Sequence, residues 1–492
     1  MQHSKKTKFV RRVARWLCAA LIWAIPAIGV AQELSPYQSD FPPEELKARW
    51  EKLFDKIGPH AIALVQGAQA GERSEVFRQS NQFYYLCGLE TPRSYLVLDG
   101  RSRKVTLYLP HRDEARERGE GKMLSAEDAD LVRKLTGVDR VAGIELMARD
   151  WMWTLYWTAQ APALYTPFSP AEGGAMTRDM MEAYKADVVA DPWDGRPSRE
   201  GHFIQLLHSK FPEFEIRNLS PILDTLRNIK SPQEIKLLRR AAHLACLGLM
   251  AAMRSTKLGA TEYQLGAVAQ YVFMINGAQG DAYHAIVASG KNTMMGHYFL
   301  NKSTLKSGHL ILMDYAPDYR YYASDVTRMW PVNGKYSPEQ RQLYTFIVKL
   351  HDTILKRIRP GVTGRQIMEE SEGELKDLVE KTRWLKAAYK EAAEKMIRQR
   401  SGFSHPVGMS VHDVGNYLAR PLEPGEVFSL DPTITVPEEN LVVRIENVIV
   451  VTKDGAENLS ALVPADPDAI EKIMQEPGML QAFPPAPPLG EE

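Results

Sequence analysis

The sequence predicts an α/β protein with two domains, the second of which consists of two similar halves. Three observations support this fold class. Strand-like apolar runs alternate with helical patterns over residues 38–220, helix-opening motifs recur in pairs from residue 231, and each pair precedes a matching strand-rich stretch that contains acids. With 492 residues, 44% hydrophobic and 25% charged, the chain is long enough for two or three globular domains.

The first 31 residues have the three-part form of a secretory signal. Residues 1–15 carry six Lys and Arg and no acid, residues 16–31 are apolar apart from a break at Pro26, and Gly29-Val30-Ala31 offers small residues for cleavage. The apolar run is short for a membrane span. We predict a signal peptide over 1–31, cleaved after Ala31, and a protein exported to a bacterial periplasm or the cell exterior. An uncleaved N-terminal anchor is the alternative.

Removal of this segment leaves 55 basic residues against 61 acidic ones, a net charge of −6. This balance predicts no nucleic-acid partner. Cys87 and Cys246 both lie in apolar runs far apart in the sequence. We predict buried free thiols, with a disulfide between them as the alternative in an oxidising compartment.

Residues 38–220 form the first predicted domain. Its strand-like runs are 61–66, 83–88, 94–100 and 104–110. The segment 125–137 has a helical pattern, and 191–201, rich in Pro, Gly and charge, is predicted to be a loop near the end of the domain.

Four capping boxes follow, each with Ser or Thr three residues ahead of Glu or Gln: Ser231 to Glu234, Thr261 to Gln264, Ser337 to Gln340 and Thr363 to Gln366. Pro232 and Pro338 take the first helical position, where a missing N–H costs nothing. These motifs predict two pairs of helices in a second domain over 221–475. Residues 476–492 form a Pro-rich tail to which we assign no function.

Each helix pair precedes a matching line of sequence, LKSGHLILMD at 305–314 and LEPGEVFSLD at 422–431, with Leu, Gly and the closing Asp in common. A second acid follows in each case, Asp325 after the first line and Glu446 after the second. The shared order predicts an internal duplication whose two halves face each other.

Such an arrangement would gather four carboxylates: Asp314, Asp325, Asp431 and Glu446. Four close anions cannot all stay ionised without cations between them. Simpler explanations exist for single acids: a turn at Asp314, an Asp325–Arg328 pair, a Glu446–Arg444 pair. None of these explains why the acids recur in both halves, so we predict two divalent ions with shared carboxylates.

Imidazole ligands are available nearby. His405 and His412 lie seven residues apart in a glycine-rich stretch, and His297 lies just before the first acidic half. A single histidine in such a place is more often a packed or surface residue than a ligand. Together with the acids, an imidazole favours Mn²⁺, Co²⁺ or Zn²⁺.

These stretches resemble a known family. LILMDYAPD with YYASDVTRMWPV, then FSHPVGMSVHDVGN, LEPGEVFSLDP and VVRIENVIVVT, are similar to the successive motifs of the Xaa-Pro aminopeptidases (aminopeptidase P) and prolidases, metallopeptidases with the pita-bread fold. EVFRQSNQFYYLCGLETPRSYLVLDG resembles the N-terminal domain of aminopeptidase P. The resemblance implies an N-terminal α/β domain of creatinase/aminopeptidase P type over 38–220 and a pseudo-twofold pita-bread catalytic domain over 221–475.

By matching motifs, the resemblance implies five metal ligands: Asp314, Asp325, His405, Asp431 and Glu446. It also implies catalytic roles for His412, His297 and Asp431, and substrate contacts for His297, His412 and Arg444. Two positions depart from the pattern: aminopeptidase P tends to have a further His where this chain has Ser401, and the family usually has Glu where this chain has Asp431. The lost methylene moves a carboxylate by about 1 Å, enough to reduce the rate about a hundredfold.

The implied reaction removes the N-terminal residue from peptides with proline at the second position. Two divalent ions, Mn²⁺ before Co²⁺ or Zn²⁺, would activate a hydroxide and polarise the scissile carbonyl. Asp431 would bind metal and take up the water proton, while His412 and His297 would donate to the carbonyl oxygen. We expect a homodimer or homotetramer. The alternatives are a prolidase-type Xaa-Pro dipeptidase and a weakly active or non-catalytic pita-bread binding protein.

Overall fold

The structure is a computed structural model that describes residues 37–70, 76–157, 162–173, 177–400 and 402–486. The predicted signal peptide lies outside these residues. Two units are distinguished, Met1–Gln38 and Ser39–Glu492, and every element described below belongs to the second. Within the described part of the chain, we find no helix with the length and apolar character needed to span a membrane.

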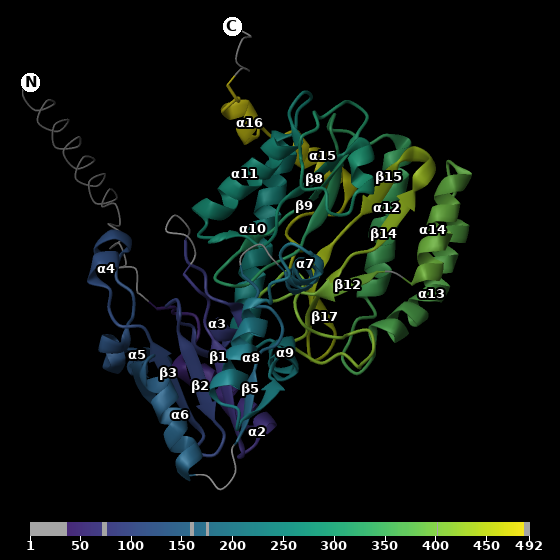
Figure 1. The fold of residues 1–492 in the computed structure, drawn as a ribbon. Helices are drawn as coiled ribbons and strands as arrows, with labels where there is room; N and C mark the ends of the chain where they lie inside the picture. Colours follow the sequence, from purple (N-terminus) through teal and green to yellow (C-terminus); the bar gives the residue numbers. More distant parts are fainter. Residues whose placement is uncertain (1–36, 71–75, 158–161, 174–176, 401, 487–492) are drawn as a thin grey trace, which may run out of the picture. The chain divides into compact units, whose positions relative to one another are not determined.

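A mixed six-stranded sheet with the strand order β4-β3-β2-β1-β5-β6 organises the N-terminal part (Figure 1). Its strands are β1 (Ala61–Gln66), β2 (Tyr95–Asp99), β3 (Lys104–Leu109), β4 (Arg140–Gly143), β5 (Ala163–Thr166) and β6 (Glu215–Asn218). β2 runs antiparallel to both β1 and β3, and the other pairs are parallel. Three strand predictions, 61–66, 94–100 and 104–110, are confirmed.

Helices accompany this sheet: α2 (Pro43–Ile57), α4 (Glu114–Glu120), the short 3₁₀ turn η1 (Ala126–Asp128), α5 (Ala129–Thr136), α6 (Leu146–Trp157), α7 (Arg178–Ala190), α8 (Arg199–Lys210) and α9 (Ser220–Asn228). Trp151 of α6 and Leu207 of α8 join Ile62, Leu64 and Leu164 of the sheet in one buried cluster. The helix predicted over 125–137 is confirmed as η1 and α5.

Two predictions in this part are wrong. The run at 83–88 is not a strand but belongs to helix α3 (Asn81–Cys87), which ends at Gly88 with φ 64°. All seven residues of α3 are buried, and a run that is apolar on every side carries no periodicity that would separate helix from strand. The loop predicted over 191–201 ends early, because Ser198 accepts a hydrogen bond from Gly201 N and starts α8 at Arg199.

The four predicted helix starts after residue 231 are all confirmed, and each has its capping box formed. These helices are α10 (Pro232–Ser255), α11 (Glu262–Ile275), α12 (Pro338–Leu355) and α13 (Gly364–Lys381). They are followed by α14 (Ala387–Gln399), α15 (Pro467–Met474) and α16 (Met479–Ala482).

The strands between the helices form two matching sheets. The first has the order β11-β9-β8, from β8 (Ile286–Ser289), β9 (Leu310–Asp314) and β11 (Thr327–Pro331). The second has the order β12-β13-β16-β17, from β12 (Phe403–Pro406), β13 (Val427–Leu430), β16 (Asn447–Val451) and β17 (Ala456–Asn458). In each half the strand that leads to the first acid pairs antiparallel with the strand that follows the second acid, as a duplicated fold requires.

Smaller elements complete this part: β7 (Gly280–Asp281) with β10 (Pro317–Asp318), β14 (Thr433–Val436) with β15 (Leu441–Arg444), and the 3₁₀ turns η2 (Gly290–Met294) and η3 (Pro437–Glu439). One hydrophobic core contains residues of both halves, among them Met313, Trp330, Phe428 and Ile449. A backbone bridge from Thr327 to Glu446 joins the halves directly.

The prediction of buried thiols is confirmed, because Cys87 and Cys246 are both buried and no disulfide joins them. The segment predicted as a tail starts with an ordered stretch. Met479 N donates to Ser255 Oγ at 2.9 Å, and Arg254 pairs with Glu476 at 2.6 Å, so α16 is fastened to the end of α10. Residues 487–492 lie outside the described part of the chain.

Candidate metal and active site

The four acids occupy equivalent places in the two halves. Asp314 is the last residue of β9, and Asp431 directly follows β13. Asp325 lies two residues before β11, and Glu446 lies one residue before β16. The antiparallel pairing in each half therefore brings a strand end and a strand start together, with one acid at each.

Side-chain contacts connect the acids of the first half. The Tyr283 hydroxyl oxygen lies 2.5 Å from Asp314 Oδ1 and 2.8 Å from Asp325 Oδ1, so its single hydrogen can be donated to either carboxylate. Burial and then the charges of these acids raise the pKa of Tyr283, so the phenol keeps its proton and acts as a donor.

Arg444, at the end of β15, links the first half to the second. Its guanidinium bonds Asp314 Oδ2, and it lies 3.6 Å from Asp431 Oδ1 and 3.7 Å from Glu446 Oε2. The structure thus places Arg444 among the acids. The predicted contact of Arg444 with substrate stays a prediction.

Glu446 and His405 complete the cluster. Glu446 accepts hydrogen bonds from Thr327 Oγ1 at 2.8 Å and from Ser429 Oγ at 2.5 Å. His405, on β12, places Nε2 3.1 Å from Asp325 Oδ2 and 3.9 Å from Glu446 Oε1. Asp325, His405 and Glu446 offer ligand atoms that all lie within 4.8 Å of one another. All five predicted ligands therefore lie in one cluster.

Burial makes this cluster electrostatically costly. The exposed fractions of Asp314, Asp325 and Glu446 are only 5%, 3% and 2%. Burial, followed by repulsion from neighbouring carboxylates, raises the pKa of both Asp325 and Asp431 well above the ordinary aspartate value. Burial also acts to raise the pKa of Glu446, but Arg444, His405 and the two hydroxyl donors outweigh it and lower that pKa.

The donor set fits divalent cations. Among the described residues, Asp431 Oδ1 is a buried oxygen with no hydrogen-bond partner. A carboxylate oxygen in this position is stabilised by a cation, and four carboxylates with one imidazole are a suitable set for Mn²⁺, Co²⁺ or Zn²⁺.

The predicted active-site histidines lie beside this cluster. The His412 ring is 4.0 Å from the His405 ring and 6.2 Å from the His297 ring, measured between centroids. His297 stacks on Phe299 with the centroids 5.8 Å apart. The three histidines therefore form a row that starts at the acids.

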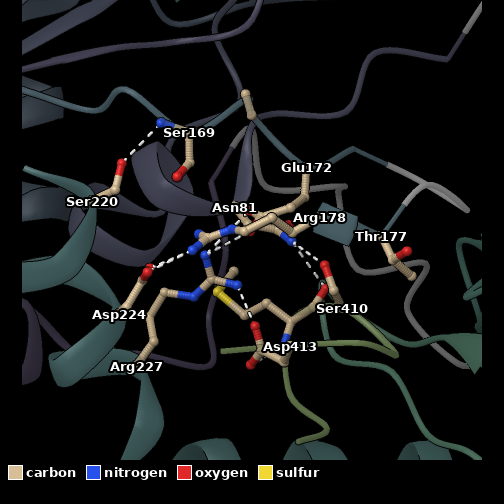
Figure 2. A network of polar contacts seen from close by, with 12 residues as sticks. Asn81, Ser169, Glu172, Thr177, Arg178, Ser220, Asp224, Arg227, Ser410 and Asp413 are labelled. Atoms are coloured by element: carbon tan, nitrogen blue, oxygen red, sulfur yellow. Dashed lines mark hydrogen bonds and ion pairs between the residues drawn. The ribbon is translucent and has the colours of Figure 1, made fainter. Parts of the chain in front are cut away.

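A buried network of charged residues, which we call the charged clamp, holds the loop that carries His412 (Figure 2). Its members are Glu172, Arg178, Asp224, Arg227, Lys230 and Asp413. Asp413 accepts from Arg227 at 2.5 Å and lies 3.6 Å from Lys230 Nζ. Although burial acts to raise the pKa of Asp413, Arg227 and Lys230 lower it.

The rest of the clamp and its surroundings belong to the N-terminal part. Arg178 contacts Glu172 at 2.8 Å and Asp224 at 2.6 Å. Asn81 Nδ2 donates to Met409 O at 3.1 Å and to Ser410 Oγ at 3.0 Å. The His412 loop is thus anchored to residues of the N-terminal part, which lie outside the duplicated part of the chain.

Three residues that form hydrogen bonds with the acids, Thr327, Ser429 and Tyr283, were not predicted from the sequence. Thr327 and Ser429 each lie two residues from a predicted ligand, Asp325 and Asp431, and this spacing was the available signal. Tyr283 lies far from every acid that it contacts, and no local pattern identifies it.

One of the simpler explanations for single acids is wrong. Arg328 does not pair with Asp325; its guanidinium donates to the carbonyls of Thr327 and Glu446 and to Asn447 Oδ1. Asp325 is therefore left to the acidic cluster.

Comparisons with known proteins agree with this arrangement. Residues 236–453 match the profile of metallopeptidase family M24, and residues 46–152 match the aminopeptidase P N-terminal domain. The Xaa-Pro aminopeptidase of Escherichia coli (strain K12) is 30% identical, and the match covers 89% of this chain and 98% of that protein. Human Xaa-Pro aminopeptidase 3 is 31% identical, with 81% of this chain and 77% of that protein covered.

Solved structures show the same fold. Aminopeptidase P from Escherichia coli with the inhibitor Pro-Leu has a TM-score of 0.69 and 27% identity, covering 89% of this chain and 99% of that one. Its zinc-substituted form in complex with product has a TM-score of 0.70 at the same identity and coverage. The predicted α/β fold class and pita-bread resemblance are confirmed. The chain belongs to the Xaa-Pro aminopeptidase (aminopeptidase P) family of metallopeptidases.

Proposed function

We propose that this protein is an exported metal-dependent aminopeptidase that hydrolyses the N-terminal Xaa-Pro bond of peptides with two divalent ions, Mn²⁺ before Co²⁺ or Zn²⁺. The observation that carries the proposal is the convergence of four carboxylates, three of them buried and the fourth, Asp431, half-buried, with one imidazole from two duplicated halves. The relatives named as Xaa-Pro aminopeptidases support the substrate, and the Pro-Leu inhibitor in one solved relative supports recognition of proline.

Each ligand has a place in this proposal. Asp325 of the first half and Glu446 of the second would hold the ions together with His405, whose Nε2 lies 3.1 Å from Asp325 Oδ2 and 3.9 Å from Glu446 Oε1. Asp314 and His405 would each hold one ion, and Asp431 has a free oxygen for a further bond. When bound, two such ions act as Lewis acids that activate the attacking water and polarise the peptide carbonyl.

The remaining residues would act on the substrate. Asp431 would take up the proton of the attacking water through Oδ1, a buried oxygen that has no hydrogen-bond partner among the described residues. His412 and His297 would donate hydrogen bonds to the carbonyl oxygen as negative charge develops there. Arg444 would hold Asp314 and Asp431 in place and contact the substrate beside them.

Export rests on the composition of residues 1–31, and a homodimer or homotetramer remains our expectation. No observation favours the two alternatives. A dipeptidase is not supported by relatives named as aminopeptidases, and a non-catalytic binding protein would not need a cluster in which four carboxylates outnumber the neighbouring cations.

The test is an assay of the mature chain reconstituted with Mn²⁺, on a Xaa-Pro peptide of four or more residues. We expect cleavage of the first bond, slower cleavage of the matching Xaa-Pro dipeptide, and none of the peptide with alanine in place of proline. Chelation should abolish activity and Mn²⁺ should restore it. Absence of cleavage in both the natural protein and Asp431→Glu would refute the proposal.

Asp431→Glu measures the effect of the unusual aspartate. If the shorter side chain places the carboxylate about 1 Å from its best position, the glutamate variant should be up to about a hundredfold faster. An unchanged or lower rate would show that the surrounding structure has adapted to Asp431.

A further inference from the structure

One contact of the active site comes from outside the duplicated part of the chain. His412 Nδ1 lies 2.7 Å from Asp179 Oδ2, and Asp179 belongs to the first turn of α7 in the N-terminal part. A carboxylate accepts hydrogen bonds and cannot donate them, so Nδ1 carries the hydrogen of this contact. Nε2 is then the ring nitrogen left for a substrate.

Asp179 is itself fixed in place. Thr177 Oγ1 donates to its other oxygen, Oδ1, while Thr177 also caps the start of α7. The carboxylate lies at the helix N-terminus, where the backbone N–H groups favour negative charge. The intervening residue, Arg178, belongs to the charged clamp through Glu172 and Asp224. Through Arg178 and Asp179, the start of α7 is thus connected to the charged clamp and to His412, and Thr177 holds Asp179 in place.

The backbone of His412 is held independently of its ring. The clamp fixes the next residue, Asp413, whose side chain is 1% exposed, and Asn81 fixes Met409 and Ser410. Fixing the backbone on both sides still leaves the ring free to rotate about its side-chain bonds. The hydrogen bond to Asp179 restricts this rotation. Asp179, a residue outside this loop, therefore sets the orientation of the His412 ring.

We infer that Asp179 is a positioning residue for His412: it holds the imidazole by Nδ1 so that Nε2 is presented to the substrate, which makes helix α7 part of the active site. The inference rests on the proposed function for its effect on catalysis. The orientation of the His412 imidazole by Asp179 can be tested without measuring catalytic activity.

The kinetic test compares Asp179→Ala with Asp179→Asn on a Xaa-Pro peptide in Mn²⁺. Asp179→Ala should lower kcat by about 10- to 100-fold, as for other groups that orient an active-site histidine, with KM changed less than about threefold. Asp179→Asn keeps an acceptor oxygen and should recover most of the rate. Glu182→Ala is the matched control, because Glu182 lies on the same helix and, among the described residues, forms an ion pair only with the half-exposed Lys185 at 3.7 Å.

A double-mutant cycle separates positioning from a structural role. If Asp179 acts through the ring, Asp179→Ala should change the rate by less than about twofold in a His412→Ala background. An equal loss in both backgrounds, or a fall in thermal stability that parallels the loss of kcat, would overturn the inference.

Nitrogen-15 NMR of histidine-labelled protein gives a readout that needs no activity. The His412 signals, identified by their loss in His412→Ala, should show a protonated Nδ1 that changes in Asp179→Ala and not in Glu182→Ala. If the natural protein fails to cleave but this pattern appears, the proposed function fails and the positioning role stands. A His412 signal that is identical in Asp179→Ala and the natural protein would refute the inference.

Discussion

Two groups of buried charges lie near His412, and they differ in charge balance. The charged clamp combines three cations with three acids, namely Arg178, Arg227 and Lys230 with Glu172, Asp224 and Asp413. The candidate metal site combines four acids with Arg444 and His405. In the clamp the cations equal the acids in number, whereas in the site the four acids outnumber Arg444 and His405. Similar residue types therefore serve a structural role in one place and, as we propose, form a cation site in the other.

The pKa directions follow the same division. In the clamp, the neighbouring cations lower the pKa of Asp413 despite its burial. In the site, burial and neighbouring carboxylates raise the pKa of Asp325 and Asp431. Neutralising an acid should consequently have opposite effects on stability in the two groups.

Asp325→Asn should produce the largest effect. The loss of a ligand to the metals should reduce kcat/KM by at least about a thousandfold, since metals supply several kcal/mol of transition-state stabilisation. In chelator, the same variant should be at least as stable as the natural protein, because one of four repelling carboxylates is gone. Activity assays, metal analysis and thermal melts in chelator check both parts. A large loss of stability in chelator would contradict the comparison.

Asp413→Asn should have the opposite effect on stability. It leaves Arg227 and Lys230 buried without their shared acid, which should cost about 3–5 kcal/mol of unfolding free energy at pH 7. Denaturant titration of the metal-free protein measures this cost. A change below about 1 kcal/mol would show that the clamp is not a balanced network.

The stability difference between the natural protein and Asp413→Asn should depend on pH in a direction that the pKa of Asp413 sets. Because the pKa of Asp413 is lowered by folding, its contribution to stability is complete above the unfolded value of about 3.9 and is lost as the pH falls through the folded value. The stability gap between the natural protein and Asp413→Asn should therefore shrink below about pH 4. A gap that is constant from pH 7 to pH 3 would exclude this assignment.

Gly408→Ala should have the smallest effect of the three. A Cβ at Gly408 would overlap Asp413 Oδ2 and approach Lys230, so the clamp must shift at a cost of about 1–3 kcal/mol. Gly373→Ala is the matched control, because it lies on α13 with nothing within 4 Å of the added Cβ and should stabilise the helix by up to about 1 kcal/mol. Equal effects of the two substitutions would show that the clamp tolerates displacement.

Local motifs and the internal repeat supplied most of the correct predictions of the fold and the candidate site. The capping boxes identified four helix starts because the responsible side chains are three residues apart. The duplicated pattern of helices, strands and acids predicted which carboxylates meet, although they lie up to 132 positions apart, from Asp314 to Glu446. Repetition thus supplied long-range information that periodicity does not contain.

The failures have a common physical cause. Helix α3 is buried on all sides, so its environment, including the stacking of Tyr84 on Tyr321, decides its conformation. Asp179 and Tyr283 reach the site through contacts with distant parts of the chain, and no repeat marks them. Residues whose role depends on a single long-range contact leave no pattern in a single sequence.

The backbone bridge between Thr327 and Glu446 has a consequence for how peptides enter and leave. Two hydrogen bonds, of 3.3 and 3.2 Å, join the halves where their acids meet, and Thr327 Oγ1 adds a third contact to Glu446. Separating the halves like a hinge would break all three. We therefore expect peptides to enter and leave on the side of His297 and His412 without separation of the two halves.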